Sequence, residues 1–301
     1  MYDRLFQKLC FTAAIIVPVL LFAILIRMAG SSAEVWETFG FQFLFSSEWN
    51  PQTEQFGAFP AILGTLLTTG IAMFFAVPLS FLTAFFLNDA PDWLRRPLSQ
   101  GLDLLAAIPS VIYGIWGLFI LVPVIQKYVQ PFLLDTLGLR ALPFMGTDAN
   151  GFGYFTAGIV LTLMILPYIS AVMRDVFRMT PTLLRESAYG IGCTRWETAR
   201  DIILPYGLRG FLGGVFIGLG RALGETMAVL FIIGNVMRTP TGIFDSGTTI
   251  AATLANNFAE ADGLMRSSLF ALGLILLVLA FLVQIPAQYY LAASRRERGE
   301  G

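Results

Sequence analysis

The chain has 301 residues, of which 56% are hydrophobic and 13% are charged, and its mean hydropathy of +0.72 is too high for an ordinary soluble domain. Its net charge of −1 gives no bulk field that would attract nucleic acid. The chain has no histidine, and its cysteines are limited to Cys10 and Cys193, which excludes a histidine-based metal site, a Ser-His-Asp triad and a Cys-His dyad.

Six apolar stretches are long enough to cross a hydrocarbon core of about 30 Å, which takes about 20 helical residues. They lie near residues 9–29, 59–87, 101–125, 151–173, 208–235 and 267–293. The sequence therefore predicts an all-α membrane protein with six transmembrane helices. We divide the chain into an N-terminal helix with the first outer loop (1–56), a core (57–293) and a cytoplasmic tail (294–301).

The first apolar stretch shares features with a secretory signal peptide. Arg4 and Lys8 precede it, and the small residues at 29–33 resemble a cleavage site. However, the stretch is longer than the apolar region of roughly 7–15 residues that is typical of such signals. We therefore expect a retained membrane span.

The distribution of basic residues predicts the orientation. Thirteen lysines and arginines lie in the two termini and in the second-to-third and fourth-to-fifth connections, whereas the opposite connections hold four. Because basic loops stay in the cytoplasm, both termini are expected there. The outer segments 30–58 and 126–150 are rich in aromatic or amphipathic patterns. Each is either a docking face on the outer surface or a helix packed on neighbouring loops.

Prolines fall inside several predicted spans. Pro78, Pro109 and Pro167 lie in the second, third and fourth apolar stretches, respectively. Proline removes a backbone hydrogen bond and kinks a helix, and neighbouring helices can compensate in a membrane. Kinked helices suit a transport pathway, but the prolines alone are equally consistent with a structural role.

The segment 180–205, which we call the elbow, is predicted to form two short helices. Thr180 can cap the first helix, with Pro181 at its first helical position. Gly190 or Gly192 can end that helix in a left-handed conformation.

The second helix of the elbow also has recognisable ends. Thr194 and Glu197 have the spacing of a capping box, which begins a helix, and Pro205 is expected to stop it. Two helices joined at glycine beneath a membrane form a compact surface for a partner protein.

The elbow resembles the signature of ABC importer permeases, in which Glu-Ala-Ala, three residues, Gly, nine residues and Ile-x-Leu-Pro follow one another. The single departure is Ser187, where alanine is usual. The matching positions are Glu186, Ala188, Gly192, Ile202, Leu204 and Pro205. In that family the loop is the coupling helix that docks on the ATPase subunit. The resemblance thus implies that these six residues couple the chain to a separate ATPase.

Four segments are similar, more narrowly, to permeases of phosphate-specific ABC importers, of the PstC type rather than its PstA-type sister. They are residues 108–117, 166–175, 186–193 and 220–229. The resemblance covers roughly residues 57–290. It implies the type I importer permease fold in a bacterial inner membrane, with three kinds of partner. These are a second permease of the PstA type, two copies of an ABC ATPase and an extracytoplasmic phosphate-binding protein.

ATP is expected at the partner ATPase and not on this chain. Lysine occurs only at Lys8 and Lys127, and neither follows a Gly-x-x-x-x-Gly run, so the chain has no P-loop. We expect it to bind no cofactor and to catalyse no reaction of its own.

Arg221 and Glu225 are charged residues inside the fifth apolar stretch. A charge at the bilayer centre is costly, by about 3 to more than 10 kcal/mol for arginine. On a continuous helix both would lie on a narrow stripe of small residues: Gly214, Gly218 and Ala228.

Two hypotheses remain for this pair. In the first, Arg221 and Glu225 form a structural ion pair one helical turn apart. In the second, Arg221 contacts phosphate in the pathway, and the carboxylate of Glu225 weakens the attraction between them. For the whole protein, the main alternative to an ATP-driven importer is an ion-coupled secondary transporter of an inorganic anion. Such a transporter would not need the elbow.

Overall fold

The computed structural model of the chain describes residues 2–142, 144–146 and 150–296. Within these residues, six helical segments are long and apolar enough to span a membrane. They are Phe6–Ser31, Phe59–Asp89, Ser110–Thr136, Tyr154–Met179, Arg195–Leu223 and Gly263–Ile285. The predicted number of spans is confirmed, but the third and fifth spans begin and end elsewhere than predicted. The predicted tail lies partly outside the described residues, since these stop at Arg296.

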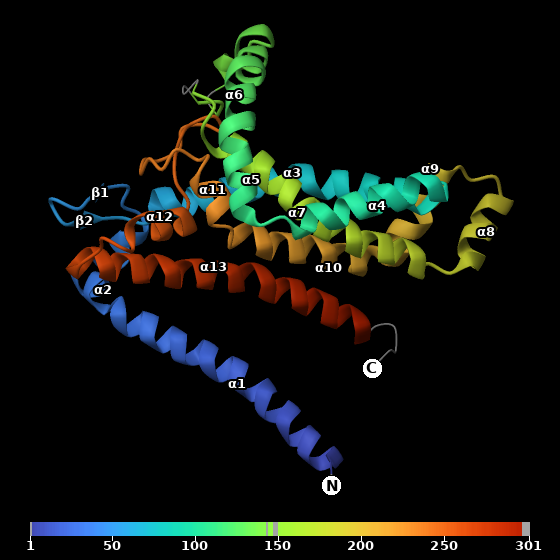
Figure 1. Cartoon of the computed structure of the whole chain (residues 1–301), viewed down its shortest axis with the longest axis horizontal. Coiled ribbons are helices and arrows are strands. Elements are labelled where there is room, and N and C mark those ends of the chain that lie inside the picture. Colours follow the sequence, from blue (N-terminus) through green and yellow to red (C-terminus); the bar gives the residue numbers. More distant parts are fainter. Residues whose placement is uncertain (1, 143, 147–149, 297–301) are drawn as a thin grey trace.

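Three helices form the centre of the bundle (Figure 1): α3 (Phe59–Asp89), α7 (Tyr154–Met179) and α10 (Leu204–Leu223). Small residues let α3 and α7 approach closely, because a Cβ added at Gly158 would lie 2.4 Å from Cγ2 of Ile71. Pro78 and Pro167 lie inside α3 and α7 without ending them. Close backbone contact of this kind is how helices associate in a membrane, where lipid tails are as apolar as leucine.

The first and last helices lie on one side of this centre. α1 (Tyr2–Ser31) has no buried residue in its apolar part, and it contacts α13 (Gly263–Arg296). Figure 1 shows that both helices extend from a common end of the bundle toward the end that carries the elbow. The chain therefore begins and finishes on the elbow's side.

The opposite end of the bundle is covered by short elements: α2 (Ala33–Phe39), η1 (Gly40–Leu44), β1 (Trp49–Asn50), β2 (Gln55–Phe56) and α12 (Ile250–Asn257). The two strands form an antiparallel hairpin in which Trp49 faces Phe56. Val35 and Phe43 are fully buried, whereas Phe41 is 80% exposed. Segment 30–58 is thus packed on its neighbours, as the second interpretation expects, and the docking face stays a prediction.

The third span differs from its prediction at 101–125. α4 (Asp92–Ala107) ends where Ile108 and Pro109 adopt extended backbone, and Pro109 therefore lies between helices and not inside a span. Proline disfavours helical geometry in the residue before it, which explains the break. The helix then resumes as a segment of α- and π-turns, which we call the arm: α5 (Ser110–Trp116), η2 (Gly117–Leu121), α6 (Val122–Val124), η3 (Ile125–Val129) and η4 (Phe132–Thr136).

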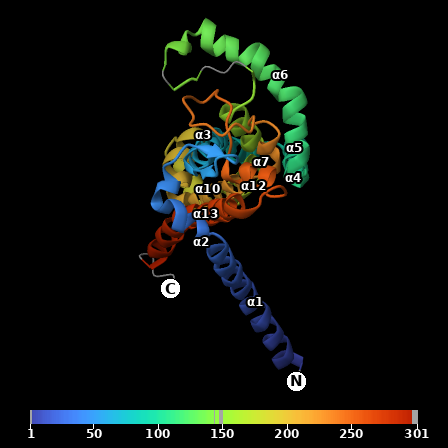
Figure 2. The ribbon, with the colours of Figure 1, turned by 90° about the vertical axis from the view of Figure 1, so that its left-hand side faces the viewer.

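The arm turns away from the bundle (Figures 1 and 2). Much of the predicted outer segment 126–150 belongs to it, followed by the short helix η5 (Leu139–Ala141). Residues 143 and 147–149 of that segment lie outside the described residues. Leu134 is buried, but Phe119 and Phe132 are exposed, so these parts of the arm have no apolar cover among the described residues.

The fifth span begins and ends earlier than the predicted 208–235. Its helix runs from Arg195 to Leu223. After Gly224 the chain forms only the short helix α11 (Met227–Leu230) and a loop in which Ile232 and Ile233 are fully buried. The apolar character of that loop reflects burial within the protein and not contact with lipid. Hydropathy does not distinguish the two.

We predict that Gly158→Ala destabilises the bundle, because the added methyl group would overlap Ile71 on α3. Overpacking of this kind costs about 1–3 kcal/mol. The matched control is Gly70→Ala on α3, where nothing lies within 4 Å of the added atom. Thermal unfolding of the detergent-solubilised protein should show a lower midpoint for the first variant only. Equal midpoints would contradict the close α3–α7 contact.

Candidate functional site: the elbow and Arg221

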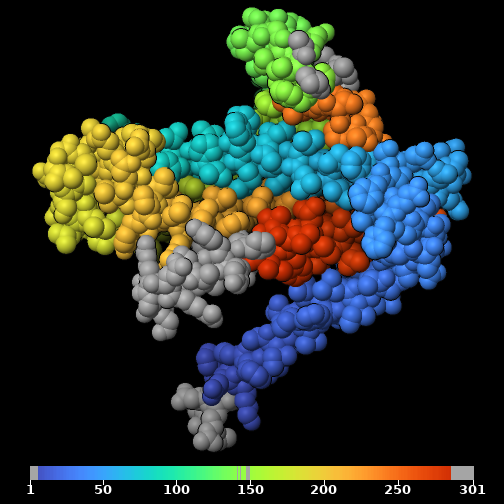
Figure 3. All heavy atoms as spheres, turned by 180° about the vertical axis from the view of Figure 1, so that it is seen from behind, coloured from blue at the N-terminus to red at the C-terminus, as the bar shows by residue number. Residues whose placement is uncertain are grey.

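The elbow projects at one end of the bundle, where its first helix is α8 (Thr182–Gly190) (Figures 1 and 3). Gly192 has φ of +95°, which confirms the predicted left-handed residue between the two helices. The predicted capping box is also confirmed. The backbone N–H of Glu197 donates to Oγ1 of Thr194 at 3.3 Å, and the N–H of Thr194 donates to Oε2 of Glu197 at 2.7 Å.

Two predictions for the first helix of the elbow are wrong. Thr180 does not cap α8; it follows the last residue of α7, and its hydroxyl donates back to the carbonyl of Val176 at 3.1 Å. Pro181 has extended backbone and precedes α8, so it does not occupy a helical position. Thr180 therefore serves the end of one helix and not the beginning of the next.

The prediction that Pro205 ends the second helix is also wrong. α9 (Arg195–Glu197) continues through η6 (Thr198–Ile203), which has π-helical turns, directly into α10. Proline clashes with the carbonyl one turn earlier in a regular α-helix. The wider π-turns immediately before Pro205 accommodate its ring. The backbone hydrogen bonds change their spacing there, and the helix continues. The second helix of the elbow and the fifth span are consequently one continuous helix.

The six signature residues lie at different depths. Ala188 is 3% exposed, and its carbonyl accepts a hydrogen bond from the N–H of Cys193 at 3.0 Å. Ile202 and Leu204 are half-buried, and the remaining three are exposed: Glu186, Gly192 and Pro205. Exposed apolar side chains surround them, and Ile191 is 83% exposed. An apolar patch at a projecting tip is typical of a protein-binding surface.

Aromatic residues tie the elbow to the bundle. The ring of Trp196 lies edge-on to Phe85 and Phe81 of α3, with centroids 5.8 and 6.3 Å apart. The same cluster includes Phe177 of α7 and Phe211 of α10. Each packed aromatic pair contributes about 0.5–1.5 kcal/mol beyond the burial of its area, so this cluster joins the elbow to three helices. Trp196 was not singled out from the sequence, where a lone tryptophan carries no signal of its partners.

Arg221 lies near the end of α10, which terminates at Leu223. Its side chain is exposed, and its guanidinium carbon lies 4.3 Å from the centroid of the Tyr168 ring on α7. Glu225 lies in the break that follows, and its Oε1 accepts a hydrogen bond from the N–H of Ala228 at 3.2 Å. Glu225 thus caps the short helix α11.

The predicted stripe shared by Arg221 and Glu225 is wrong, because the helix ends between them. Among the described residues, no ion pair joins the two side chains. The small residues of the stripe instead face α7: a Cβ added at Gly218 would lie 2.5 Å from Cδ1 of Ile169. An i, i+4 argument assumes unbroken helix, and Gly224 removes that condition.

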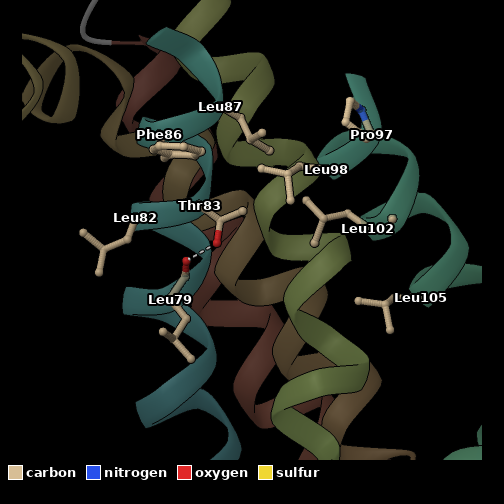
Figure 4. Close-up of a pocket in the computed structure, with 10 residues that line it drawn as sticks. Leu79, Leu82, Thr83, Phe86, Leu87, Pro97, Leu98, Leu102 and Leu105 are labelled. Carbon is tan, nitrogen blue, oxygen red and sulfur yellow. Dashed lines mark hydrogen bonds between the residues drawn. The ribbon is translucent and has the colours of Figure 1, made fainter. Parts of the chain in front are cut away.

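An apolar groove of about 690 Å³ lies between α3 and α4 (Figure 4). Its lining includes Leu79, Leu98 and Leu102 and no charged residue. The hydroxyl of Thr83 donates to the carbonyl of Leu79 at 2.7 Å and is not available to a ligand. The groove has no charged side chain that would bind an anion, whereas Arg221 carries a guanidinium that can.

The chain is similar to known proteins over most of its length. The family described as "Binding-protein-dependent transport system inner membrane component" matches residues 76–296. The chain is 48% identical to a phosphate transport system permease protein, PstC, of Haemophilus influenzae, over 99% of this chain and 96% of the relative. It is 50% identical to the PstC protein of Mesorhizobium japonicum, over 96% of this chain and 90% of the relative.

A solved structure shares the fold. A bacterial alginate ABC transporter, in complex with its alginate-loaded periplasmic protein, contains a chain that aligns with a TM-score of 0.61 over 96% of both chains. The sequences are 19% identical, so this likeness concerns the fold alone. The elbow and the core helices therefore belong to an importer permease architecture.

We predict that Gly192→Ala loosens the elbow, because alanine at a φ of +95° is strained by about 1–3 kcal/mol. Gly190→Ala is the matched control, since both glycines have open space for a Cβ and only Gly192 has positive φ. Amide hydrogen exchange over residues 182–197 should become faster in the first variant alone. Unchanged exchange would show that the left-handed turn does not hold the elbow together.

Proposed function

The chain belongs to the binding-protein-dependent transport system inner membrane components, and on this premise we propose that it works as the membrane pathway of an ATP-driven phosphate importer. It is a multi-pass protein of the bacterial plasma (inner) membrane and a permease subunit of a phosphate transport system. The observation that carries this function is near-full-length similarity to phosphate permeases, combined with an elbow that projects from the bundle.

The permease needs partners that supply what its sequence lacks. We assign ATP binding and hydrolysis to two copies of an ABC ATPase, because this chain has no P-loop lysine. A second permease of the PstA type would complete the pathway, and its helices would cover the exposed faces of α1 and the arm. An extracytoplasmic phosphate-binding protein would deliver the solute at the end that carries the hairpin.

The elbow is the docking surface for the ATPase in this proposal. The excess of basic residues at the elbow's end supports a cytoplasmic position for that end. Its exposed residues Leu183, Tyr189 and Ile191 offer the apolar contact, and Glu186 offers a charge beside it. Closure of the two ATPases would push on the elbow, and the continuous helix from Arg195 to Leu223 would carry that displacement to Arg221.

Arg221 is the proposed contact for phosphate in the pathway. Guanidinium donors match phosphate oxygens in a planar fork, and such bonds are charge-assisted. Because the carboxylate of Glu225 accepts the N–H of Ala228 and caps α11, it lies near the proposed pathway without an ion pair to the guanidinium donors of Arg221. The anion can then pair with Arg221 transiently as the permease alternates between outward and inward access. Selectivity for phosphate would rest mainly on the binding protein.

We predict that Arg221→Gln lowers phosphate import about tenfold or more, because a charge-assisted hydrogen bond contributes about 1.5–3 kcal/mol. Arg209→Gln, on the same helix but at the elbow's end, is the matched control and should import normally. Labelled phosphate uptake is measured in vesicles that contain all partner subunits, with and without ATP. Normal import by the Arg221 variant at normal protein levels would reject the pathway role, and import without ATP would reject the ATP-driven function.

We predict that Ile191→Asp weakens ATPase docking, since a carboxylate left unpaired in an interface costs about 1–3 kcal/mol. Phe41→Asp is a matched control at the opposite end, because Phe41 is 80% exposed and Ile191 is 83% exposed. The amount of ATPase that copurifies with each tagged variant should fall for Ile191→Asp alone. Equal copurification would place the ATPase contact elsewhere.

A further inference from the structure

The hydroxyls of two tyrosines bond to carbonyls at the end of α4. This helix stops at Ala107, so its last carbonyls have no partner within the helix. The hydroxyl of Tyr113 donates to the carbonyl of Leu105 at 2.8 Å, and the hydroxyl of Tyr168 donates to the carbonyl of Ala106 at 2.8 Å. Both hydroxyls are therefore committed to backbone oxygens, and each ring is fixed at its far end.

The ring of Tyr168 contacts the guanidinium group of Arg221. The guanidinium carbon lies 4.3 Å from the ring centroid, which is the geometry of a cation–π contact. A guanidinium carries all five of its N–H donors in its own plane. A guanidinium carbon that lies over a ring is bound through its charge and not through a hydrogen bond, so N–H donors that point away from the ring stay free, whereas an ion pair with a carboxylate would use them.

The neighbouring carboxylate does not compete for those edges. Glu225 accepts the N–H of Ala228, and no ion pair between it and Arg221 occurs within the part of the chain that the structure describes. The side chain of Arg221 lies over the ring of Tyr168 near the end of α10. An arginine held in this way is oriented without being neutralised.

We infer that Tyr168 is a positioning residue for the passing anion: its ring holds the guanidinium of Arg221 by the face and presents the in-plane donors to phosphate. This inference rests on the proposed function, in which Arg221 contacts phosphate. Tyr168 touches neither the anion nor the ATPase, and it acts through Arg221.

The anchoring of Tyr168 also connects it to the elbow. Arg174 of α7 donates to Oγ of Ser99 at 3.0 Å and lies 3.8 Å from Asp103, so it fastens α4 along α7. At the other end, Asp89, just before α4, lies 3.9 Å from Arg195 of the elbow. The carbonyl that holds the Tyr168 hydroxyl therefore belongs to a helix that begins beside the elbow. A shift of the elbow reaches Arg221 through the ring as well as through α10.

The test compares three variants of the complete transporter in proteoliposomes: Tyr168→Phe, Tyr168→Leu and Tyr113→Phe. Phosphate import and ATP hydrolysis are measured on the same preparations. Tyr168→Leu removes the ring and should lower import about tenfold, while ATP hydrolysis stays within about twofold. Tyr168→Phe keeps the ring and should retain import within about threefold, and Tyr113→Phe should behave alike, because each loses one hydroxyl bond.

The decisive measurement is the double variant with Arg221→Gln. If Tyr168 acts through Arg221, adding Tyr168→Leu to Arg221→Gln lowers import no further. An additive loss, or a parallel loss of ATP hydrolysis, would show that Tyr168 is only structural and would overturn the inference. Normal import by Arg221→Gln alone would instead reject the proposed pathway role. A defect in Arg221→Gln with normal import by Tyr168→Leu would reject the positioning role alone.

Discussion

The break in the helix between Leu223 and Met227 separates Arg221 from Glu225, and the chemistry of the site depends on that separation. On an unbroken helix the two side chains would pair and largely cancel each other's charge. Because the helix stops, Glu225 turns to the N–H of Ala228 and Arg221 turns to the face of Tyr168. Among the described residues no counter-charge occupies the donors of Arg221, and this suits an anion that must bind briefly and leave.

The same chain of contacts relates the site to the elbow. The helix that begins at Arg195 continues past Pro205 to Leu223, so the second helix of the elbow and Arg221 belong to one rod. Trp196 fastens the start of this rod to Phe81 and Phe85 of α3. Aromatic packing at one end and close glycine contacts with α7 along its length join this helix to the bundle. In the proposed alternating access, these packed helices would be displaced together around Arg221 and Tyr168.

Much of this fold could be predicted from the sequence, and the errors have physical causes. Six spans followed from apolar length, and the capping box of Thr194 and Glu197 followed from spacing, because both signals are local. Pro205 misled the prediction because the π-turns that accommodate it are not visible in the sequence. The apolar run through Ile232 and Ile233 resembled a membrane helix because burial in protein and burial in lipid demand the same residues. Tyr168 was missed as a partner of Arg221 because α7 and α10 meet only in the folded chain.

The most direct test of the account is a structure of the assembled importer trapped with phosphate in the membrane. The account predicts phosphate oxygens about 2.7–2.9 Å from the guanidinium edge of Arg221, as in other charge-assisted pairs, with the Tyr168 ring on the guanidinium face. A phosphate bound away from Arg221, with the guanidinium paired to Glu225, would contradict it.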